Sequence, residues 1–173
     1  MFTVTKYMDM KLPSDFSPEE RRERAMSLFR QGYNCCQSVV LTFADVLSEQ
    51  VTVELLATIG SGFGGGMARM REVCGSFSGV VIMSGFISPA TDPTNQDGRR
   101  ANYALVQQFA EEFKKRNGGS IVCRELLGLA PAKIVEDPAP SARTEEYYKK
   151  RPCAEIIGNA AMIVAEYLVR NQK

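Results

Sequence analysis

Apolar residues recur at helical spacing along most of this chain, and that periodicity constrains its fold more than any other feature. Between Thr94 and Asn117, for example, Ala101, Leu105 and Phe109 fall on one face, as in an amphipathic helix. Outside the first few positions, no stretch of useful length alternates apolar and polar residues, which argues against half-buried strands. The sequence therefore predicts an all-α, single-domain helical bundle of about six or seven helices.

Capping residues and prolines indicate where these helices begin. Ser17 predicts the start of a first helix, Asn34 that of a second, and Pro152 that of a terminal helix. The segments "TVELLATIG" and "SIVCRELLG" predict two short helices. The segment "LAPAKIVEDPAPSAR" holds three prolines and is predicted to be a loop.

The stretch "EVCGSFSGVVIMSG", residues 72–85, is predicted to be the central, buried helix. Gly75 and Gly79 stand four positions apart, and small residues at that spacing let another element approach the helix backbone. Five glycines between Gly60 and Gly66 exclude a stable helix just before it. That segment predicts either a tight turn against the central helix or a source of backbone N–H groups for a nearby site.

Length, charge and hydropathy limit what kind of protein this is. We expect residues 1–16 to form an N-terminal arm and residues 17–173 a single all-α, cysteine-bearing domain. A net charge of +1 without a basic stripe argues against nucleic-acid binding. The longest apolar run, 79–90, is too short to span a membrane, and the N-terminus does not resemble a secretory signal. We therefore expect a soluble, cytoplasmic protein, in which cysteines favour metal or redox chemistry over structural disulfides.

The chain contains no histidine, and this excludes several classes of site. Serine–histidine–acid triads, cysteine–histidine pairs, histidine-ligated zinc and histidine-ligated haem all require that residue. Neither a nicotinamide nor a flavin fingerprint is present, because the glycine-rich segment lacks a preceding strand. The residues leave open whether the chain is an enzyme.

Every cysteine lies in the first turn of a predicted helix. Cys35 and Cys36 open the second helix, Cys74 the central helix, Cys123 a short one, and Cys153 the last. A helix N-terminus carries unpaired N–H groups and partial positive charge, which stabilise a thiolate. We therefore expect the pKa of these thiols to lie below the ordinary value of about 8.5, at a site that favours anions.

A plain structural interpretation competes with this one. Cysteine is among the most buried residue types, so five cysteines could simply be small core residues. The chain has no C-x-x-C pair, and the spacings of 39, 49 and 30 residues between Cys35, Cys74, Cys123 and Cys153 carry little specificity. From the residues alone, both interpretations stay open.

Four segments in order, "GYNCCQSVV", "GFGGGMARMREVCGSFSG", "CRELLG" and "CAEIIGNAAMIVAEYL", resemble the redox-active bacterial family named for its C_GCAxxG_C_C pattern. The resemblance extends from about residue 25 to residue 168 and assigns the family's four cysteines to Cys35, Cys74, Cys123 and Cys153. Ser76 stands where the family motif has alanine. Cys36 is then an extra thiol, for which we expect a buried structural role.

The resemblance also implies a cofactor. A similar cysteine-bearing domain in split-Soret cytochromes is associated with an iron–sulfur cluster beside haem. The haem half of that analogy fails here, because the chain has no histidine. Four thiolates suffice for [2Fe–2S] or [4Fe–4S], so the resemblance implies that Cys35, Cys74, Cys123 and Cys153 bind an iron–sulfur cluster or another metal for electron transfer. It implies an unidentified redox partner and allows a homo-oligomer.

Three alternatives stay open, two of which use the same cysteines. Cys74 and Cys123 could cycle between dithiol and disulfide, which requires one pair of cysteines with Cα atoms about 5.5 Å apart. The four cysteines could instead form a structural zinc site in a binding module. Finally, Arg69, Arg71 and Arg124 could hold an anionic ligand near the thiols without redox work.

The arginines and two further segments of the chain each allow a second interpretation. The arginines at positions 69, 71 and 124 could instead pair with acids such as Glu72 and Glu125 at the surface. Residues 129–150 could form a flap over the thiols, and residues 1–16 an arm across a neighbouring subunit. The simpler expectation is that both segments are surface connections.

Overall fold

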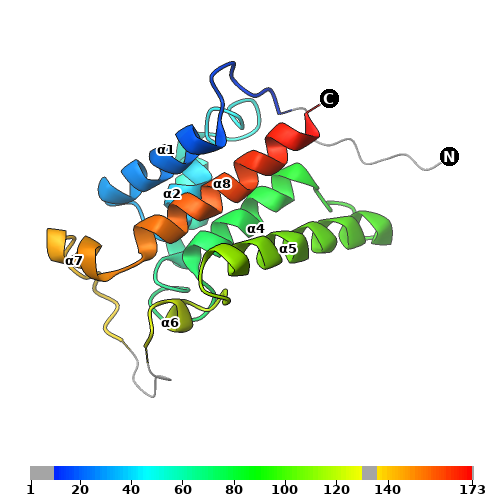
Figure 1. Cartoon of the computed structure of the whole chain (residues 1–173). Helices are drawn as coiled ribbons and strands as arrows, with labels where there is room; N and C mark the ends of the chain where they lie inside the picture. The colour runs from blue at the N-terminus through cyan, green and yellow to red at the C-terminus, as the bar shows by residue number, and fades with distance from the viewer. Residues whose placement is uncertain (1–9, 130–135, 173) are drawn as a thin grey trace.

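The computed structural model describes residues 10–129 and 136–172, and within them the chain is entirely helical apart from turns and loops (Figure 1). Within the described residues, Val73 and Val122 form an isolated antiparallel β-bridge. The predicted all-α class is confirmed. The helices are α1 (Pro18–Arg30), α2 (Cys35–Leu41), α3 (Val53–Gly60), the 3₁₀ turn η1 (Ser61–Phe63), α4 (Gly75–Ile87), α5 (Gln96–Arg116), α6 (Cys123–Leu126), α7 (Glu145–Lys150) and α8 (Cys153–Asn171).

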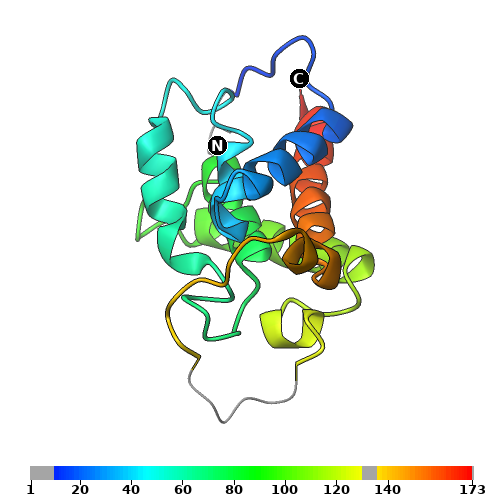
Figure 2. The same ribbon diagram turned by 90° about the vertical axis from the view of Figure 1, so that its left-hand side faces the viewer.

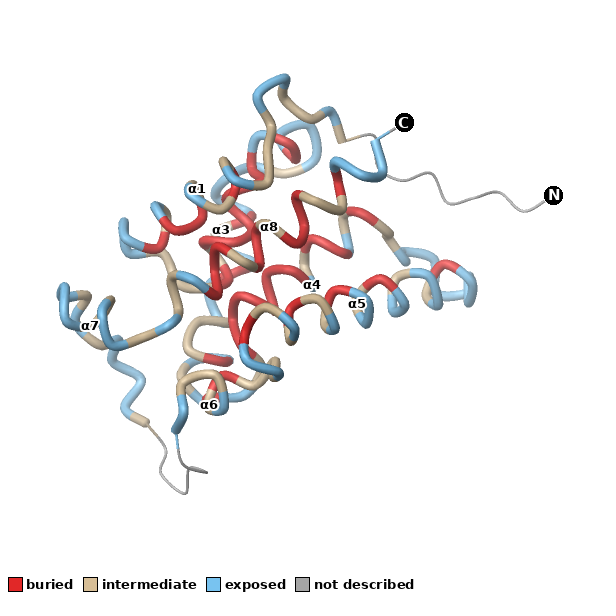
Figure 3. Tube along the Cα trace, in the orientation of Figure 1, coloured by how far each residue is buried: buried red, intermediate tan, exposed pale blue. Residues whose placement is uncertain are grey.

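Helix α4 lies at the centre of the bundle, as predicted. It packs against α2, α5 and α8, while α8 also runs along α1 (Figure 1). Helix α3 flanks α2 on the side away from α8 (Figure 2). Buried residues gather on α2, α4 and α8, whereas the outer face of α5 is exposed (Figure 3). The core therefore lies where these helices meet, around α4.

Two glycines of α4 let α2 come close to it. A Cβ added at Gly79 would lie 2.8 Å from Val39 Cβ and 3.2 Å from the Cys36 carbonyl oxygen. A Cβ added at Gly75 would lie 2.6 Å from the Phe63 carbonyl oxygen and 3.1 Å from Cys35 Cβ. The predicted role of small residues four apart is confirmed, because any larger side chain would push α2 or η1 away.

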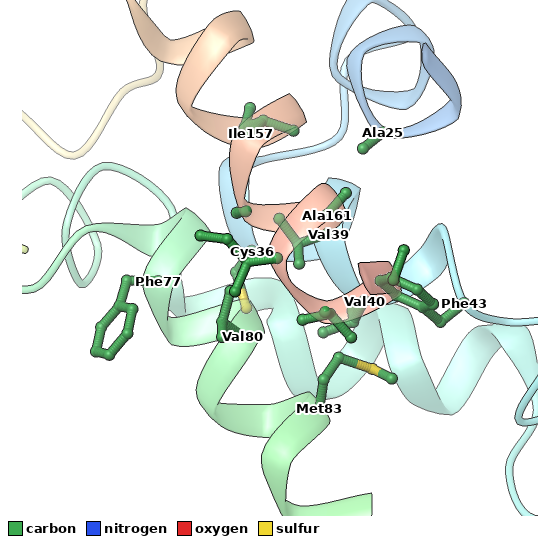
Figure 4. Packing of buried hydrophobic residues seen from close by; sticks show 14 of the residues in the cluster. Ala25, Cys36, Val39, Val40, Phe43, Phe77, Val80, Met83, Ile157 and Ala161 are labelled. Atoms are coloured by element: carbon green, nitrogen blue, oxygen red, sulfur yellow. The ribbon is translucent and has the colours of Figure 1, made fainter. Parts of the chain in front are cut away.

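Cys36 belongs to this core. Its side chain is completely buried in one hydrophobic cluster with Val39 and Val80, among others (Figure 4). The burial that we expected for this extra thiol is confirmed.

The second helix is shorter than its apolar spacing predicts. It ends at Leu41, although Phe43 and Leu47 further along are fully buried. Arg21 of α1, itself only 2% exposed, donates to the Thr42 carbonyl oxygen at 2.6 Å and forms a paired ion contact with Asp45 at 2.7 and 2.8 Å. The Thr42 carbonyl is thus hydrogen-bonded to Arg21, and the Val46 N–H to the Asp45 carboxylate, instead of to each other across a helical turn.

Helix α7 was not predicted, because the prolines around residues 131–140 suggested one long loop. Local signals for it exist, since Thr144 caps the helix by accepting from the Tyr147 N–H. Lysines in its last turn pair with glutamates in its first turn, at Lys149–Glu145 and Lys150–Glu146.

Part of the predicted N-terminal arm packs on its own chain, since Met10, Leu12 and Phe16 contact the core. Residues 1–9 and 130–135 lie outside the described residues, so the division at residues 16 and 17 stays a prediction. Across the described residues, no helix combines the length and the apolar character needed to cross a membrane.

The contact between α2 and α4 predicts opposite effects for two glycines of the same helix. Gly79→Ala should lower the free energy of unfolding by about 1–3 kcal/mol, because the new methyl overlaps Val39. Gly85→Ala has nothing within 4 Å of the added Cβ and should raise it by about 0.5–1 kcal/mol through helix propensity. Urea unfolding of both variants measures this, and equal effects would contradict the close approach.

Candidate functional site

Four cysteines line one cavity of about 340 Å³. They are Cys35, Cys74, Cys123 and Cys153, the four that the family resemblance singled out, and they come from α2, α4, α6 and α8. The cavity lies toward the end of the molecule that carries α6 and α7 (Figure 1). Cys36 does not line it. The structure therefore brings together the predicted set and separates the extra thiol from it.

Each cysteine stands at a helix start, as predicted. Cys35, Cys123 and Cys153 are the first residues of their helices, and Cys74 is the N-cap of α4. Asn34 fixes the start of α2 through a capping box, and its side-chain amide also donates to the carbonyls of residues 60 and 61. That contact ties Cys35 to the glycine-rich segment.

A short antiparallel bridge brings Cys74 and Cys123 together, although 49 residues separate them in sequence. The Cys74 N–H donates to the Ile121 carbonyl at 2.8 Å, and the Cys123 N–H donates to the Glu72 carbonyl at 2.6 Å. These backbone bonds hold both residues at the rim of the same cavity.

The glycine-rich segment continues into an unusual left-handed turn. Residues 65–69 all have positive φ, including Met67 at 58°, Ala68 at 47° and Arg69 at 68°. For residues other than glycine this conformation costs about 1–2 kcal/mol each. Backbone hydrogen bonds from residues 69, 71 and 72 back to the carbonyls of residues 64, 65 and 66 hold the turn in place. Strain of this kind concentrates at functional sites.

Both roles that the sequence suggested for the glycines are found. The Gly65 N–H is hydrogen-bonded to the Cys35 sulfur. A Cβ on Gly66 would lie 2.6 Å from Cys123 Cβ, so only glycine fits against that cysteine. The segment is thus a tight turn that also supplies an N–H group to a thiol.

The expected lowering of the thiol pKa is wrong for most of the cysteines. Burial raises the pKa of both Cys36 and Cys74 to about 12. At Cys74 the N–H groups of residues 76 and 77 act to lower the pKa, but loss of hydration outweighs them. Burial also raises the pKa of Cys123, against the opposing effect of Arg71. Helix N-termini therefore stabilise these sulfurs less than burial disfavours their ionised form.

Cys35 and Cys153 form a hydrogen-bonded pair. This contact, followed by burial, raises the pKa of Cys35, while the same contact lowers the pKa of Cys153 despite its burial. Cys153 therefore ionises first, and the Cys35 thiol donates to its sulfur. The two cysteines in direct contact are thus not the predicted thiol–disulfide pair, Cys74 and Cys123, whose redox role stays a prediction.

The arginines near the cysteines divide into two groups. Arg124 lies outside the cavity and pairs with Glu72, so surface pairing is confirmed for it, although not with Glu125, which accepts from Ser120 instead. Arg69 and Arg71 line the cavity and share the carboxylate of Glu136. The two Arg71 contacts with this carboxylate measure 2.6 and 2.7 Å.

The segment between Glu136 and α8 covers the cavity. Pro138, Pro140, Ser141, Arg143 and Tyr147 all line it, and Figure 2 shows this stretch running across the end of the molecule toward α7. The described part of residues 129–150 thus lines the thiol cavity and is not only a surface connection.

Sequence reasoning missed Arg143, Tyr147 and Arg151. The Arg143 guanidinium lies 4.3 Å from the centre of the Phe29 ring and 5.1 Å from that of Tyr147, and Arg151 lies 4.8 Å from the latter. Only Tyr147 lies within α7, whereas Arg143 precedes that helix and Arg151 follows it, so no periodicity in the sequence marks the three as one group.

Among the described residues, which include all five cysteines, no three Cys, Asp or Glu side chains are placed to hold one metal ion. The cavity therefore presents four thiols, of which Cys35 and Cys153 are in contact.

The comparison with known families can now be set beside this geometry. Residues 33–167 match the family described as "Putative redox-active protein (C_GCAxxG_C_C)". The chain belongs to this family. The match contains all four cavity cysteines and confirms the family resemblance, and it indicates a redox-related function. No curated protein and no solved structure matches the chain.

The paired thiols predict an order of alkylation in reduced, metal-free protein. Only the thiolate reacts, so labelling by iodoacetamide rises with pH through each pKa. Cys153 should be modified at lower pH than Cys35, and Cys74 should stay unmodified at pH 8 because its pKa is about 12. Peptide mapping by mass spectrometry gives the order.

A matched variant isolates the contact. In Cys153→Ser the partner thiolate is absent, so the pKa of Cys35 should fall and its labelling should shift to lower pH. Faster labelling of Cys74 than of Cys153 in the native protein would contradict the assignment.

Proposed function

We propose that the protein transfers electrons through an iron–sulfur cluster bound in the cysteine cavity by Cys35, Cys74, Cys123 and Cys153. The observation that supports this most directly is that four cysteines, 39, 49 and 30 residues apart, line one cavity while the fifth does not. Small core cysteines would have no reason to converge in this way.

The surroundings of the sulfurs suit an anionic cluster. The backbone N–H group of Gly65 is hydrogen-bonded to the Cys35 sulfur, and those of Ser76 and Phe77 to the Cys74 sulfur. The Arg71 side chain is hydrogen-bonded to the Cys123 sulfur. Hydrogen bonds of this kind stabilise bound thiolates and tune the reduction potential. When bound, the cluster would supply one-electron chemistry that the side chains lack. Its binding would displace the thiol protons that burial retains.

The described residues do not form a ready-made structural zinc site. A single zinc ion draws its sulfur ligands to about 2.3 Å from one point. The described residues place no three candidate ligands in that way. A cluster distributes its four thiolates over several iron atoms, so its ligands lie farther apart.

Thiol–disulfide exchange is the second candidate, and the Cys35–Cys153 hydrogen bond favours it. The Cys153 thiolate would attack a disulfide of a redox partner and displace one partner thiolate. Cys35 would then attack the mixed disulfide, transfer its proton and release the second partner thiol. Two electrons pass to the partner as the Cys35–Cys153 disulfide forms.

Anaerobic purification, a visible spectrum, and iron and sulfide analysis test the first candidate. We expect a brown protein with both elements bound. Cys74→Ser should lose most of the bound iron, because it removes a cavity thiol. The matched change Cys36→Ser should retain it, because Cys36 lies in the core outside the cavity. Equal loss in the two variants would contradict the ligand assignment.

A colourless protein would favour the second candidate. In that case mild oxidation should join the Cys35 and Cys153 peptides in one disulfide, detected by mass spectrometry without reduction. Oxidation that joins Cys74 to Cys123 instead would reject this pair and support the original assignment of the redox-active thiols.

A further inference from the structure

The cavity contains more positive charge than its acidic groups balance. Four guanidinium groups line it, from Arg69, Arg71, Arg143 and Arg151, and one carboxylate, Glu136, pairs with the first two. Among the described residues no carboxylate lies within ion-pair distance of Arg143 or Arg151. Buried or half-buried cations without anionic partners are costly, so such a cluster requires a purpose.

Aromatic rings hold the two unpaired arginines in place. Arg143 stacks on Phe29 and Tyr147, and Arg151 also stacks on Tyr147. Within residues 10–129 and 136–172, the hydrogen bonds of Arg143 are long ones of 3.4 Å to the carbonyls of residues 29 and 33. Stacking fixes a guanidinium plane while leaving its edge N–H groups free to bind, and that edge matches carboxylate and phosphate oxygens.

Two further donors at the cavity lack acceptors. Ser76, 1% exposed, lines the cavity, and its hydroxyl has no hydrogen-bond partner among the described residues. The same holds for Nε of Arg69. Buried polar atoms are nearly always paired, so these donors point to a ligand rich in acceptors.

We infer that the cavity binds a small anionic molecule that carries a carboxylate or phosphate group, beside the cysteines and between Arg143 and Arg151. A volume of about 340 Å³ lies at the lower end of the range for small-molecule sites. The covering segment that contributes Arg143 and Tyr147 places the ligand next to Cys153, whose sulfur feels the charge of Arg151. The inference rests on the proposed function only in taking this cavity as the working centre.

Alkylation of Cys153 by two reagents of different charge tests the inference in metal-free, reduced protein. Iodoacetate is an anion and iodoacetamide is neutral, but both transfer a similar group to sulfur. The ratio of their rates at Cys153 should exceed the ratio in the urea-unfolded chain about tenfold, because a cationic cleft concentrates anions. Inorganic phosphate should lower the rate at which iodoacetate alkylates Cys153.

Substitutions distinguish a local effect of Arg143 and Arg151 from an effect of the overall charge of the protein. Arg143→Gln and Arg151→Gln should each bring the ratio several-fold closer to the unfolded value. Arg143→Lys keeps the charge and should retain most of the ratio, which guards against misfolding of the glutamine variant. Arg100→Gln is the control. Arg100 lies exposed on α5, so this substitution removes the same charge away from the cavity. A native ratio equal to the unfolded one, or equal loss in Arg100→Gln, would overturn the inference.

The cluster-loaded protein supplies a second reading. Phosphate should perturb its visible or paramagnetic-resonance spectrum in the native protein but not in Arg151→Gln. An effect of phosphate confined to the metal-free protein would mean that the arginines only balance the cluster charge, and would overturn the inference. If the protein binds a cluster but its metal-free form shows no preference for iodoacetate at Cys153, the anion site is rejected and the proposed cluster stands. If the protein shows a strong preference for iodoacetate but never binds iron, the proposed cluster is rejected and the anion site stands.

Discussion

The close approach of α2 and α4 is the contact on which the rest of the structure depends. It exists because Gly75 and Gly79 present no side chain toward Cys35, Val39 and the Phe63 carbonyl. Through it, the start of α2 lies against the start of α4, and the glycine-rich turn fits between them. The cavity forms at this junction, so the same two glycines that tighten the core also set the distance between the first two cysteines of the site.

Burial, rather than the helix dipole, decides the charge state of most of the thiols. The helix starts supply N–H groups to the sulfurs, as at Cys74, yet the pKa of that thiol rises to about 12 because the ionised form loses its hydration. Cys153 differs because its partner is another thiol that donates to it. Burial therefore favours the neutral form of Cys74 and Cys123 in this cavity, while the Cys153 sulfur ionises before that of Cys35.

The strained turn at residues 65–69 and the segment from Glu136 to Arg151, which includes α7, form two walls of the cavity. The turn carries Arg69 and is followed by Arg71. The segment from Glu136 to Arg151 brings the Glu136 carboxylate to both arginines. This pairing joins the two walls across 65 residues of sequence. It also explains why the cavity retains positive charge, because one carboxylate serves two arginines while Arg143 and Arg151 rest on aromatic rings.

The sequence by itself determined the helical class, most helix starts and the buried central helix, because caps, glycines and apolar spacing act within a few residues of one another. It singled out Cys35, Cys74, Cys123 and Cys153 only through the family resemblance of its motifs. It could not determine where α2 ends, since a buried arginine from another helix takes the Thr42 carbonyl. It could not pair Cys35 with Cys153, raise the thiol pKa values or bring Arg143, Tyr147 and Arg151 to the cavity. Those depend on distances between segments far apart in sequence and on how much water reaches each group, and only the packed tertiary structure decides both.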